Sequence, residues 1–435
     1  MAELEGLEGR DRRFALRLGV IALLALAVRV AYILMLERTD RFGGDAFYYH
    51  EQANLLADGR GFLEPYQLET TGRELPSAYH PPLYPLFLAF VSLLASPATL
   101  AHQLASAVIG AATVVVTGLL GRRVGGPTVG WVAAAVAAVY PGLWISDALV
   151  MSETPTAFLV AVTLLGAYRH LDRPTRASAL LLGAACGLAA LTRGETLLLV
   201  PLVVLPVCLR RSGAATLLPY GHAALAVGAV AVLLAPWVLR NLAVFERPVL
   251  VSTNDGTTLG SANCGATYGG DLLGFWNFGC LDFPAREDES VARDHWRDRG
   301  LSYARDHLGR LPVVAAARVG RVWSLYRPLQ MVRFDTIEGR DTRVSKAALA
   351  GFYVMVPAAV TGSLALRRRA VPVFPLAAMF VLVTVTAAAF YGITRFRITA
   401  EVPLVVLAAT GAVEATRRGR RRVRSRPRDG GPGPA

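Results

Sequence analysis

The sequence predicts an all-α membrane protein that crosses the bilayer many times. Of its 435 residues, 54% are hydrophobic and only 18% are charged, a composition that excludes an ordinary soluble globular chain. Apolar stretches of about twenty residues, enough to cross a bilayer as a helix, recur along most of the chain. The first of them, residues 14–36, is too long and too poorly flanked for a cleaved signal peptide, so we expect it to remain as an anchor.

Apolar runs separated by polar residues define the expected spans. They lie near residues 14–36, 80–120, 127–147, 152–170, 177–193, 195–210, 219–239, 346–366, 371–390 and 398–416. In the region 80–120 we expect one full crossing and a broken half-helix, because the prolines of "HPPLYPLFLAFVSLLASP" interrupt helical hydrogen bonding. The segment 317–328, "ARVGRVWSLYRP", is typical of an amphipathic helix at the membrane surface.

The placement of arginine predicts the orientation, because loops rich in arginine normally stay in the cytoplasm. A cytoplasmic N-terminus places the arginine clusters at 122–123, 169–176, 210–211 and 367–369 and the C-terminal tail on the same side. The expected parts are a cytoplasmic N-terminus (1–13), a membrane module (14–240) with a first outer loop (37–79), an extracytoplasmic loop region (241–345), C-terminal membrane helices (346–416) and a basic cytoplasmic tail (417–435). We therefore expect a multi-pass protein of the plasma (inner) membrane.

The net charge of +13 does not indicate a nucleic-acid-binding protein. Eight arginines lie within residues 417–428, directly after the last apolar run. Such a cluster beside a span normally faces the anionic cytoplasmic leaflet. The expected partners are therefore membrane lipids, and no nucleic acid.

Polar residues that are unusual for a membrane protein gather on the predicted outer side. They are Asp45 after the first span, His80, Glu153 at a span start, Arg193 and Glu195 at an outer turn, Arg240 and Asn241 at a span end, and Arg395 and Arg397 before the last span. A carboxylate can accept the proton of an attacking hydroxyl, and arginines can hold a phosphate and stabilise its departing charge. The pattern favours group transfer from a phosphate-linked donor, and a lipid-linked donor would explain a site at the membrane surface.

Six short motifs in this order resemble one family of membrane enzymes. They are "GD…YY" after the first span, "AYHPPLYPLFLA", "SET", "GLAALTR", "PWVLRN…F…P…ST…G" and "YGITRFR…P". The chain resembles the dolichyl-phosphate-mannose-protein mannosyltransferase-like glycosyltransferases, the branch that includes the aminoarabinose transferases. The resemblance implies a GT-C-like bundle of about 10–12 transmembrane helices with the active site in extracytoplasmic loops. It also implies an inverting hexosyl- or pentosyltransferase that takes its sugar from a polyprenyl phosphate.

The resemblance also implies roles for individual residues. Asp45 matches the acidic residue of the first loop, which serves as general base or orients the acceptor, and Glu153 matches the second acidic position. Arg395 or Arg397 matches the basic residues that bind the lipid phosphate. Arg193 stands where relatives commonly carry lysine, which keeps the charge but alters its reach. The acceptor would be a hydroxyl or amine on a glycan, a lipid or a protein.

Each of these residues also has a structural interpretation. Asp45 could cap a helix that begins at Ala46, and Glu153 could be a first-turn acid favoured by the helix dipole. Arg395 and Arg397 could extend to the lipid headgroups as anchors. Arg193 and Glu195 could pair only with each other.

The remaining substrate-binding candidates have structural interpretations too. His80, followed by two prolines, suits a structural role better than a catalytic one. Tyr48 and Tyr49 could stack on a sugar, but aromatic residues are common at membrane interfaces. No compact ligand motif indicates a metal site, although a divalent cation shared by Asp45 and Glu153 stays open.

The four cysteines divide into two pairs. Cys186 and Cys208 lie in apolar segments and are expected in the core. Cys264 and Cys280 share one predicted outer loop, where a disulfide can persist, and the glycines between them let the chain turn back. We expect a disulfide there, with two free thiols among aromatic residues as the alternative.

Two other functions compete with the glycosyltransferase. A transporter or a flippase for lipid-linked sugars would show repeated halves or discontinuous helices around a site at the middle of the membrane. The sequence shows no internal repeat. A scaffold without catalytic activity explains neither the outer carboxylates nor the arginines.

Overall fold

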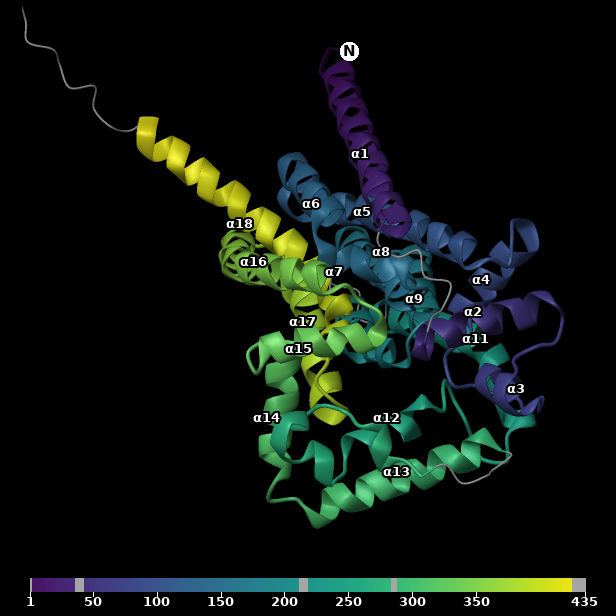
Figure 1. The fold of residues 1–435 in the computed structure, drawn as a ribbon. Coiled ribbons are helices and arrows are strands. Elements are labelled where there is room, and N and C mark those ends of the chain that lie inside the picture. The colour runs from purple at the N-terminus through teal and green to yellow at the C-terminus, as the bar shows by residue number, and fades with distance from the viewer. Residues whose placement is uncertain (1, 36–42, 211–217, 283–287, 425–435) are drawn as a thin grey trace, which may run out of the picture.

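The computed structural model describes residues 2–35, 43–210, 218–282 and 288–424. Helices make up the fold, and the described residues contain no β-strand (Figure 1). The α-helices are α1 (Ala2–Met35), α2 (Gly44–Ala57), α3 (Pro65–Thr71), α4 (Leu83–Leu94), α5 (Thr99–Gly125), α6 (Pro127–Val139), α7 (Pro141–Trp144), α8 (Glu153–Asp172), α9 (Arg176–Ala190), α10 (Leu205–Cys208), α11 (Leu218–Val244), α12 (Asn254–Ala262), α13 (Glu289–Asp306), α14 (Leu311–Val322), α15 (Pro328–Phe334), α16 (Thr342–Arg368), α17 (Phe374–Ala389) and α18 (Ile398–Arg424). Short 3-10 helices connect some of these elements, among them η1 (Ile145–Ala148), η2 (Gly194–Leu198), η7 (Asp335–Glu338) and η8 (Thr394–Arg397).

The predicted polytopic membrane fold is confirmed. Five helical stretches in the described ranges are long and apolar enough to cross a membrane: Asp11–Met35, Thr99–Gly125, Pro219–Val244, Thr342–Arg368 and Thr394–Gly419. The apolar pair Pro127–Val139 and Pro141–Ala148 bends by 71°, and shorter apolar helices occupy Leu83–Leu94, Arg176–Ala190, Gly194–Cys208 and Phe374–Ala389. The short helix α4 before the full-length α5 is the broken half-helix expected in the region 80–120.

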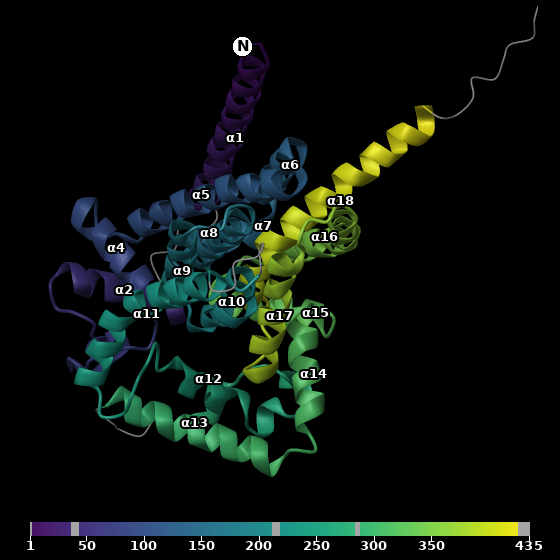
Figure 2. The same ribbon diagram turned by 180° about the vertical axis from the view of Figure 1, so that it is seen from behind.

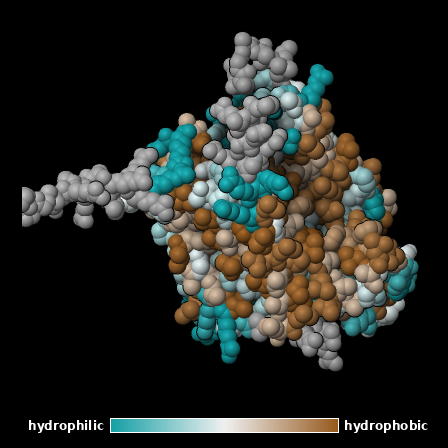
Figure 3. All heavy atoms as spheres, turned by 90° about the horizontal axis from the view of Figure 1, so that it is seen from above, coloured by the Kyte–Doolittle hydropathy of each residue, from teal (hydrophilic) through white to brown (hydrophobic). Residues whose placement is uncertain are grey.

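The last span is the centre of the bundle. The apolar window of α18 is 89% buried, whereas the windows of α1 and α11 are only 28% buried. Large side chains such as Leu23 and Val232 on these outer helices are exposed, as expected where a helix contacts lipid. Apolar side chains also cover much of the bundle in the space-filling view (Figure 3). Helices α16 and α18 approach closely at Gly362 and Gly411, where an added Cβ would overlap the facing backbone.

Both ends of the described chain lie on one side of the bundle. The first turns of α1 and the last turns of α18 lie at the top of Figure 1, and α12 and α13 lie at the bottom, an arrangement that Figure 2 shows from behind. We call these two sides the tail face and the loop face. Residues 37–42 of the expected first outer loop and residues 425–435 of the expected tail lie outside the described residues.

The loop face is a layer of short helices with defined starts. Asp288 caps α13 by accepting from the backbone N–H of Ser290 at 2.8 Å, and Asp341 caps α16 by accepting from Arg343 N–H at 2.8 Å. The expectation of one amphipathic helix over residues 317–328 is wrong. Helix α14 ends at Val322, and the indole N–H of the next residue, Trp323, donates to the Thr384 hydroxyl at 3.0 Å, which turns it into the bundle.

The loop layer is joined to the segment before α4 by Glu289. Its carboxylate accepts a hydrogen bond from the Thr253 hydroxyl and one from the backbone N–H of Ala78, at 3.4 Å. The backbone N–H of Thr253 also donates to the Ala78 carbonyl at 3.0 Å. Burial raises the pKa of Glu289 to about 7, because few groups compensate its charge there.

The stability of the protein should therefore depend on the charge of Glu289. When folding raises the pKa of a carboxyl, the protonated carboxyl favours the folded state. This contribution to stability is complete below the pKa of the unfolded state and is lost as pH rises toward 7. At pH 8, the free energy of unfolding of Glu289→Gln should exceed that of the wild type by on the order of 1–3 kcal/mol, so the variant should unfold at a higher temperature. At pH 5 the two proteins should differ little. Thermal unfolding in detergent at both pH values measures this. An equal offset at the two pH values would show that the charge of Glu289 is not responsible.

The expected disulfide is present in the loop layer. Cys264 and Cys280 form an S–S bond, with Cα atoms 6.3 Å apart, while Cys186 and Cys208 are free and buried as expected. The bond closes a loop between α12 and α13, and closure of a loop of this size stabilises a fold by about 3 kcal/mol in the chain-entropy model.

Mass spectrometry of alkylated, non-reduced peptides should recover residues 264 and 280 in one cross-linked peptide pair. Cys264→Ser and Cys280→Ser should each lower the unfolding temperature, and the double variant should lower it no further than either single variant. Alkylation of both thiols before reduction would show that the bond is absent from the purified protein.

Candidate active site

The guanidinium of Arg395 gathers three carboxylates that lie far apart in the sequence. It belongs to η8, directly before the central helix α18. Its Nε atom lies 2.5 Å from a Glu153 oxygen, Nη1 lies 2.7 Å from Glu338, and Nη2 lies 2.7 Å from Asp45. All three nitrogens of this side chain therefore face an anion. We call these four residues the Arg395 cluster.

Asp45 is the most accessible carboxylate of the Arg395 cluster. It lies in the first turn of α2, after Gly44, whose positive φ of 59° suits glycine. Its side chain is 23% exposed, and its second oxygen lies 3.3 Å from the His80 ring. Burial raises the pKa of Asp45, but the charges of Arg395 and His80 outweigh that effect and hold the pKa well below its usual range. Asp45 is thus an anion with a solvent-facing side, and not a helix cap.

Glu153 lies beneath Asp45 with no exposed side-chain surface. It begins α8, as expected of a first-turn acid, but it also pairs with Arg395 and, at 2.7 Å, with Nη1 of Arg193. The Nε atom of Arg193 in turn lies 2.6 Å from Glu195. The pairing of Arg193 with Glu195 is therefore present, and it extends into the Arg395 cluster. One oxygen of Glu153 thus holds both Arg395 and Arg193, and its second oxygen has no hydrogen-bond partner among the described residues.

Three predicted substrate-binding residues form an aromatic support behind Asp45. The His80 ring is buried and stacks on Tyr49, with ring centroids 4.6 Å apart. Tyr48 is buried too, and its hydroxyl lies 2.8 Å from the Ser77 hydroxyl. These contacts orient the ring that touches Asp45, and neither tyrosine faces the solvent.

Arg240 and Asn241 are not part of the Arg395 cluster. Arg240 donates to the backbone carbonyls of Ser77, at 3.0 Å, and Phe62, at 3.2 Å. Its guanidinium also donates to the side-chain oxygen of Asn241, which is buried. Arg240 therefore holds the chain on both sides of α3, and Asn241 supports Arg240.

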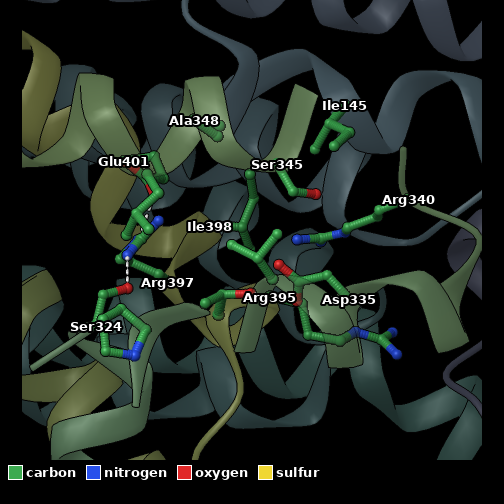
Figure 4. A pocket seen from close by; sticks show the side chains of 15 residues that line it. Ile145, Ser324, Asp335, Arg340, Ser345, Ala348, Arg395, Arg397, Ile398 and Glu401 are labelled. Carbon is green, nitrogen blue, oxygen red and sulfur yellow. Dashed lines mark hydrogen bonds and ion pairs between the residues drawn. The ribbon is translucent and has the colours of Figure 1, made fainter. Parts of the chain in front are cut away.

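Arg397 lies on a cavity beside the Arg395 cluster (Figure 4). Its Nε atom lies 2.6 Å from Glu401, one turn further along, and Nη1 donates to the Ser324 hydroxyl at 3.1 Å. Arg395 and Arg397 are both buried, so neither extends to the headgroups as an anchor. The cavity is narrow, with a volume of about 30 Å³ for the centre of a water-sized molecule, and part of it opens to solvent.

Polar groups without partners line this cavity. Among the described residues, the buried hydroxyl of Ser345 and one oxygen of Glu401 have no hydrogen-bond partner. Arg340 lies on the side opposite Arg397 in Figure 4, and its Nη2 donates a 3.3 Å hydrogen bond to the Ser146 hydroxyl. Arg340, Arg395 and Arg397 outnumber the two carboxylates that also line the cavity, Asp335 and Glu401, so the lining is net positive and suits an anion.

The sequence did not indicate Glu338 or Arg340. Both belong to "DTIEGRDTR", a stretch between α15 and α16 that reads as an ordinary polar loop. Only the tertiary fold brings this stretch against η8, where Asp335 accepts a 2.7 Å hydrogen bond from the Thr394 hydroxyl. No local pattern in the sequence could have identified the two residues.

Arg395 supplies the positive charge between Asp45 and Glu153. The sequence alone left undecided whether these two carboxylates share a divalent cation. In the described part of the chain, no three His, Cys, Asp or Glu side chains are placed to hold a metal ion.

Comparison with known proteins identifies the fold. Residues 79–239 match the model of the family described as dolichyl-phosphate-mannose-protein mannosyltransferase. One similar structure is the oligosaccharyltransferase AglB of Archaeoglobus fulgidus in complex with an inhibitory peptide and a dolichol-phosphate. It shares the fold with a TM-score of 0.58 and 12% sequence identity, and the match covers 98% of this chain and 53% of AglB. The apo form of the oligosaccharyltransferase from the same organism gives a TM-score of 0.55 at 14% identity, over 95% and 51%.

ArnT of Cupriavidus metallidurans bound to undecaprenyl phosphate is also similar, with a TM-score of 0.44 and 16% identity over 94% of this chain and 79% of that one. No curated protein sequence matches the chain. The chain spans about half the length of the oligosaccharyltransferases that it resembles. The resemblance predicted from the motifs is confirmed: the chain is a polytopic all-α membrane protein of the GT-C fold, with the dolichyl-phosphate-mannose-protein mannosyltransferase pattern in residues 79–239.

Proposed function

We propose that the protein is an inverting glycosyltransferase that moves a sugar from a polyprenyl phosphate to an acceptor hydroxyl or amine at the loop face. One observation carries this proposal: a solvent-facing carboxylate, Asp45, is bound by an arginine that also lines a cavity suited to an anion. Proton acceptor and phosphate site are then neighbours, as a single displacement requires. The arginine-rich tail face would lie in the cytoplasm, which places the site on the outer side.

The proposed reaction is one displacement at the anomeric carbon. The acceptor oxygen or nitrogen forms a bond to that carbon while the bond from the carbon to the phosphate oxygen breaks. The electron pair of the broken bond leaves with the phosphate, and the acceptor's proton passes to Asp45. Arg395 and Arg397 stabilise the charge that grows on the departing phosphate, since guanidinium groups match its oxygens bidentately.

Donor binding should also prepare Asp45 as a base. Arg395 and His80 hold the pKa of Asp45 low, which makes it a weak proton acceptor. A phosphate that shares Arg395 supplies negative charge nearby and reduces this effect. The pKa of Asp45 then rises, so that its proton affinity is greatest when a donor is in place.

The comparisons support the proposed substrates. The family that matches residues 79–239 takes its name from a dolichyl-phosphate sugar donor, and the similar AglB structure contains a dolichol-phosphate and a peptide. A flippase for lipid-linked sugars would share the lipid but not the chemistry. Incubation of the purified protein with radiolabelled polyprenyl-phosphate sugars separates these functions: released or transferred sugar supports the transferase, and translocation without bond cleavage supports the flippase.

Replacing the proposed proton acceptor should stop turnover but not donor binding. Asp45→Asn should lower the transfer rate by about two orders of magnitude or more, because a general base commonly contributes that much. The matched control is Asp58→Asn, which makes the same change at the exposed C-terminal cap of the same helix. Single-turnover transfer measures the rate, and donor titration measures binding. Transfer at the wild-type rate by folded Asp45→Asn protein would remove Asp45 from the mechanism.

The cavity arginines should set donor affinity. Arg395→Lys and Arg397→Lys keep the charge but lose the bidentate geometry, so each should weaken donor binding by about 1.5–3 kcal/mol and change acceptor affinity less. Arg333→Lys, on the exposed side of α15, is the control. Donor titration of the purified variants is the measurement, and unchanged affinity in both would contradict the assignment.

A further inference from the structure

Each nitrogen of the Arg395 guanidinium already faces a carboxylate. Its Nε, Nη1 and Nη2 atoms lie 2.5–2.7 Å from three different carboxylates. Two of the five N–H groups, one on Nη1 and one on Nη2, are not used by these carboxylates, but a phosphate bound through them would lie beside Glu338 and Asp45 and be repelled by their charges. Strong binding therefore requires that one of the carboxylates withdraw. Under the proposed function, on which this inference rests, one of the three must therefore move when the donor arrives.

Glu338 is the carboxylate that can move. Glu153 has no exposed side-chain surface and is also held by Arg193, and Asp45 is held by His80 as well. Glu338 is 14% exposed, and within the described ranges its carboxylate pairs with Arg395 alone. It ends η7, where Gly339 follows with a φ of 79°, a left-handed conformation that turns the chain away.

A second partner for Glu338 is already nearby. Arg340 lies two residues further on, is half-buried on the anion cavity, and has no carboxylate within ion-pair distance in the described part of the chain. The charge of Arg340 already acts on Glu338 from its present position. The segment that carries both residues is fixed at its ends, by Thr394 at Asp335 and by the cap of α16 at Asp341. Because the backbone on both sides is held, we expect the exchange to need only a rotation of the Glu338 side chain.

We propose that Glu338 is an internal competitor of the donor phosphate: it occupies Nη1 of Arg395 in the empty protein and transfers to Arg340 when the phosphate binds. Only molecules in which Glu338 has left Arg395 bind the donor strongly. The observed Kd therefore equals the intrinsic Kd divided by the fraction of molecules in that competent state. The contact sets the donor affinity and keeps the Arg395 cluster charge-paired between turnovers.

Removing the competitor should tighten donor binding. Glu338→Gln and Glu338→Ala should each lower the Kd for undecaprenyl phosphate, presented in detergent micelles, by about tenfold, the effect of a competent fraction of about one tenth in the wild type. Glu69→Gln is the control, because it removes the same charge from an exposed position of α3 on the same face. Titration monitored by thermophoresis gives the three affinities, and size-exclusion chromatography verifies that the variants are folded.

The role of Arg340 requires a double-variant cycle. Arg340→Ala should weaken binding in the wild-type background, where it removes the alternative partner of Glu338, and should have little effect in the Glu338→Gln background. Equal weakening in both backgrounds would mean that Arg340 contacts the phosphate directly, and it would overturn the transfer of Glu338.

The outcomes separate this inference from the proposed function. Wild-type protein that binds undecaprenyl phosphate, with Glu338→Gln and Glu338→Ala no tighter, overturns the inference and leaves the transferase in place. Failure of the wild type and of every variant to bind the lipid phosphate overturns both. Tighter binding by the two Glu338 variants but not by Glu69→Gln is the expected result.

Discussion

The site depends on one buried positive charge, the guanidinium of Arg395, surrounded by more carboxylates than one cation can neutralise. Loss of Arg395 would leave these carboxylates without their shared cation, which costs far more than an exposed ion pair contributes. The same requirement joins α2, α8 and the loop between α15 and α16 to the start of α18. Elements separated by up to 350 residues are thus fixed around one side chain. Because α18 is the most buried of the long spans in the described chain, its first turn is a rigid place for that charge.

The sequence predicted the fold well because its signals are local. Each span is a continuous apolar run, and the prolines that interrupt the region 80–120 produce the short α4 before α5. The Cys264–Cys280 bond followed from two cysteines in one loop. The error at residues 317–328 has a tertiary cause, because the hydroxyl of Thr384 on α17 draws Trp323 inward and ends the helix early.

The site was predicted only in part, for the opposite reason. Asp45, Glu153, Arg193 and Arg395 stand out because a charge at the end of an apolar run is rare, and the fold brings all four together. The sequence cannot show that Glu153 is covered while Asp45 stays open, since that depends on the tertiary packing around Arg395. Glu338 gave no signal at all, because charge is common in polar loops. Its position against Arg395 follows from the packing of a distant segment.

The placement of Glu153 itself depends on a second buried ion pair within the membrane bundle. Arg29 on α1 lies 2.6 Å from Asp147 of η1, and Asp147 accepts a 2.7 Å hydrogen bond from the hydroxyl of Thr154, the neighbour of Glu153. Gly110 on α5 provides the space for this ion pair, because a Cβ atom at that position would overlap the Asp147 carboxylate. A charge at this depth is stable only when paired, so the pair holds η1 and the start of α8 at one position. Through that turn, α1 and α5 determine where the oxygens of Glu153 meet Arg395, and the membrane bundle sets the geometry of a site at its surface.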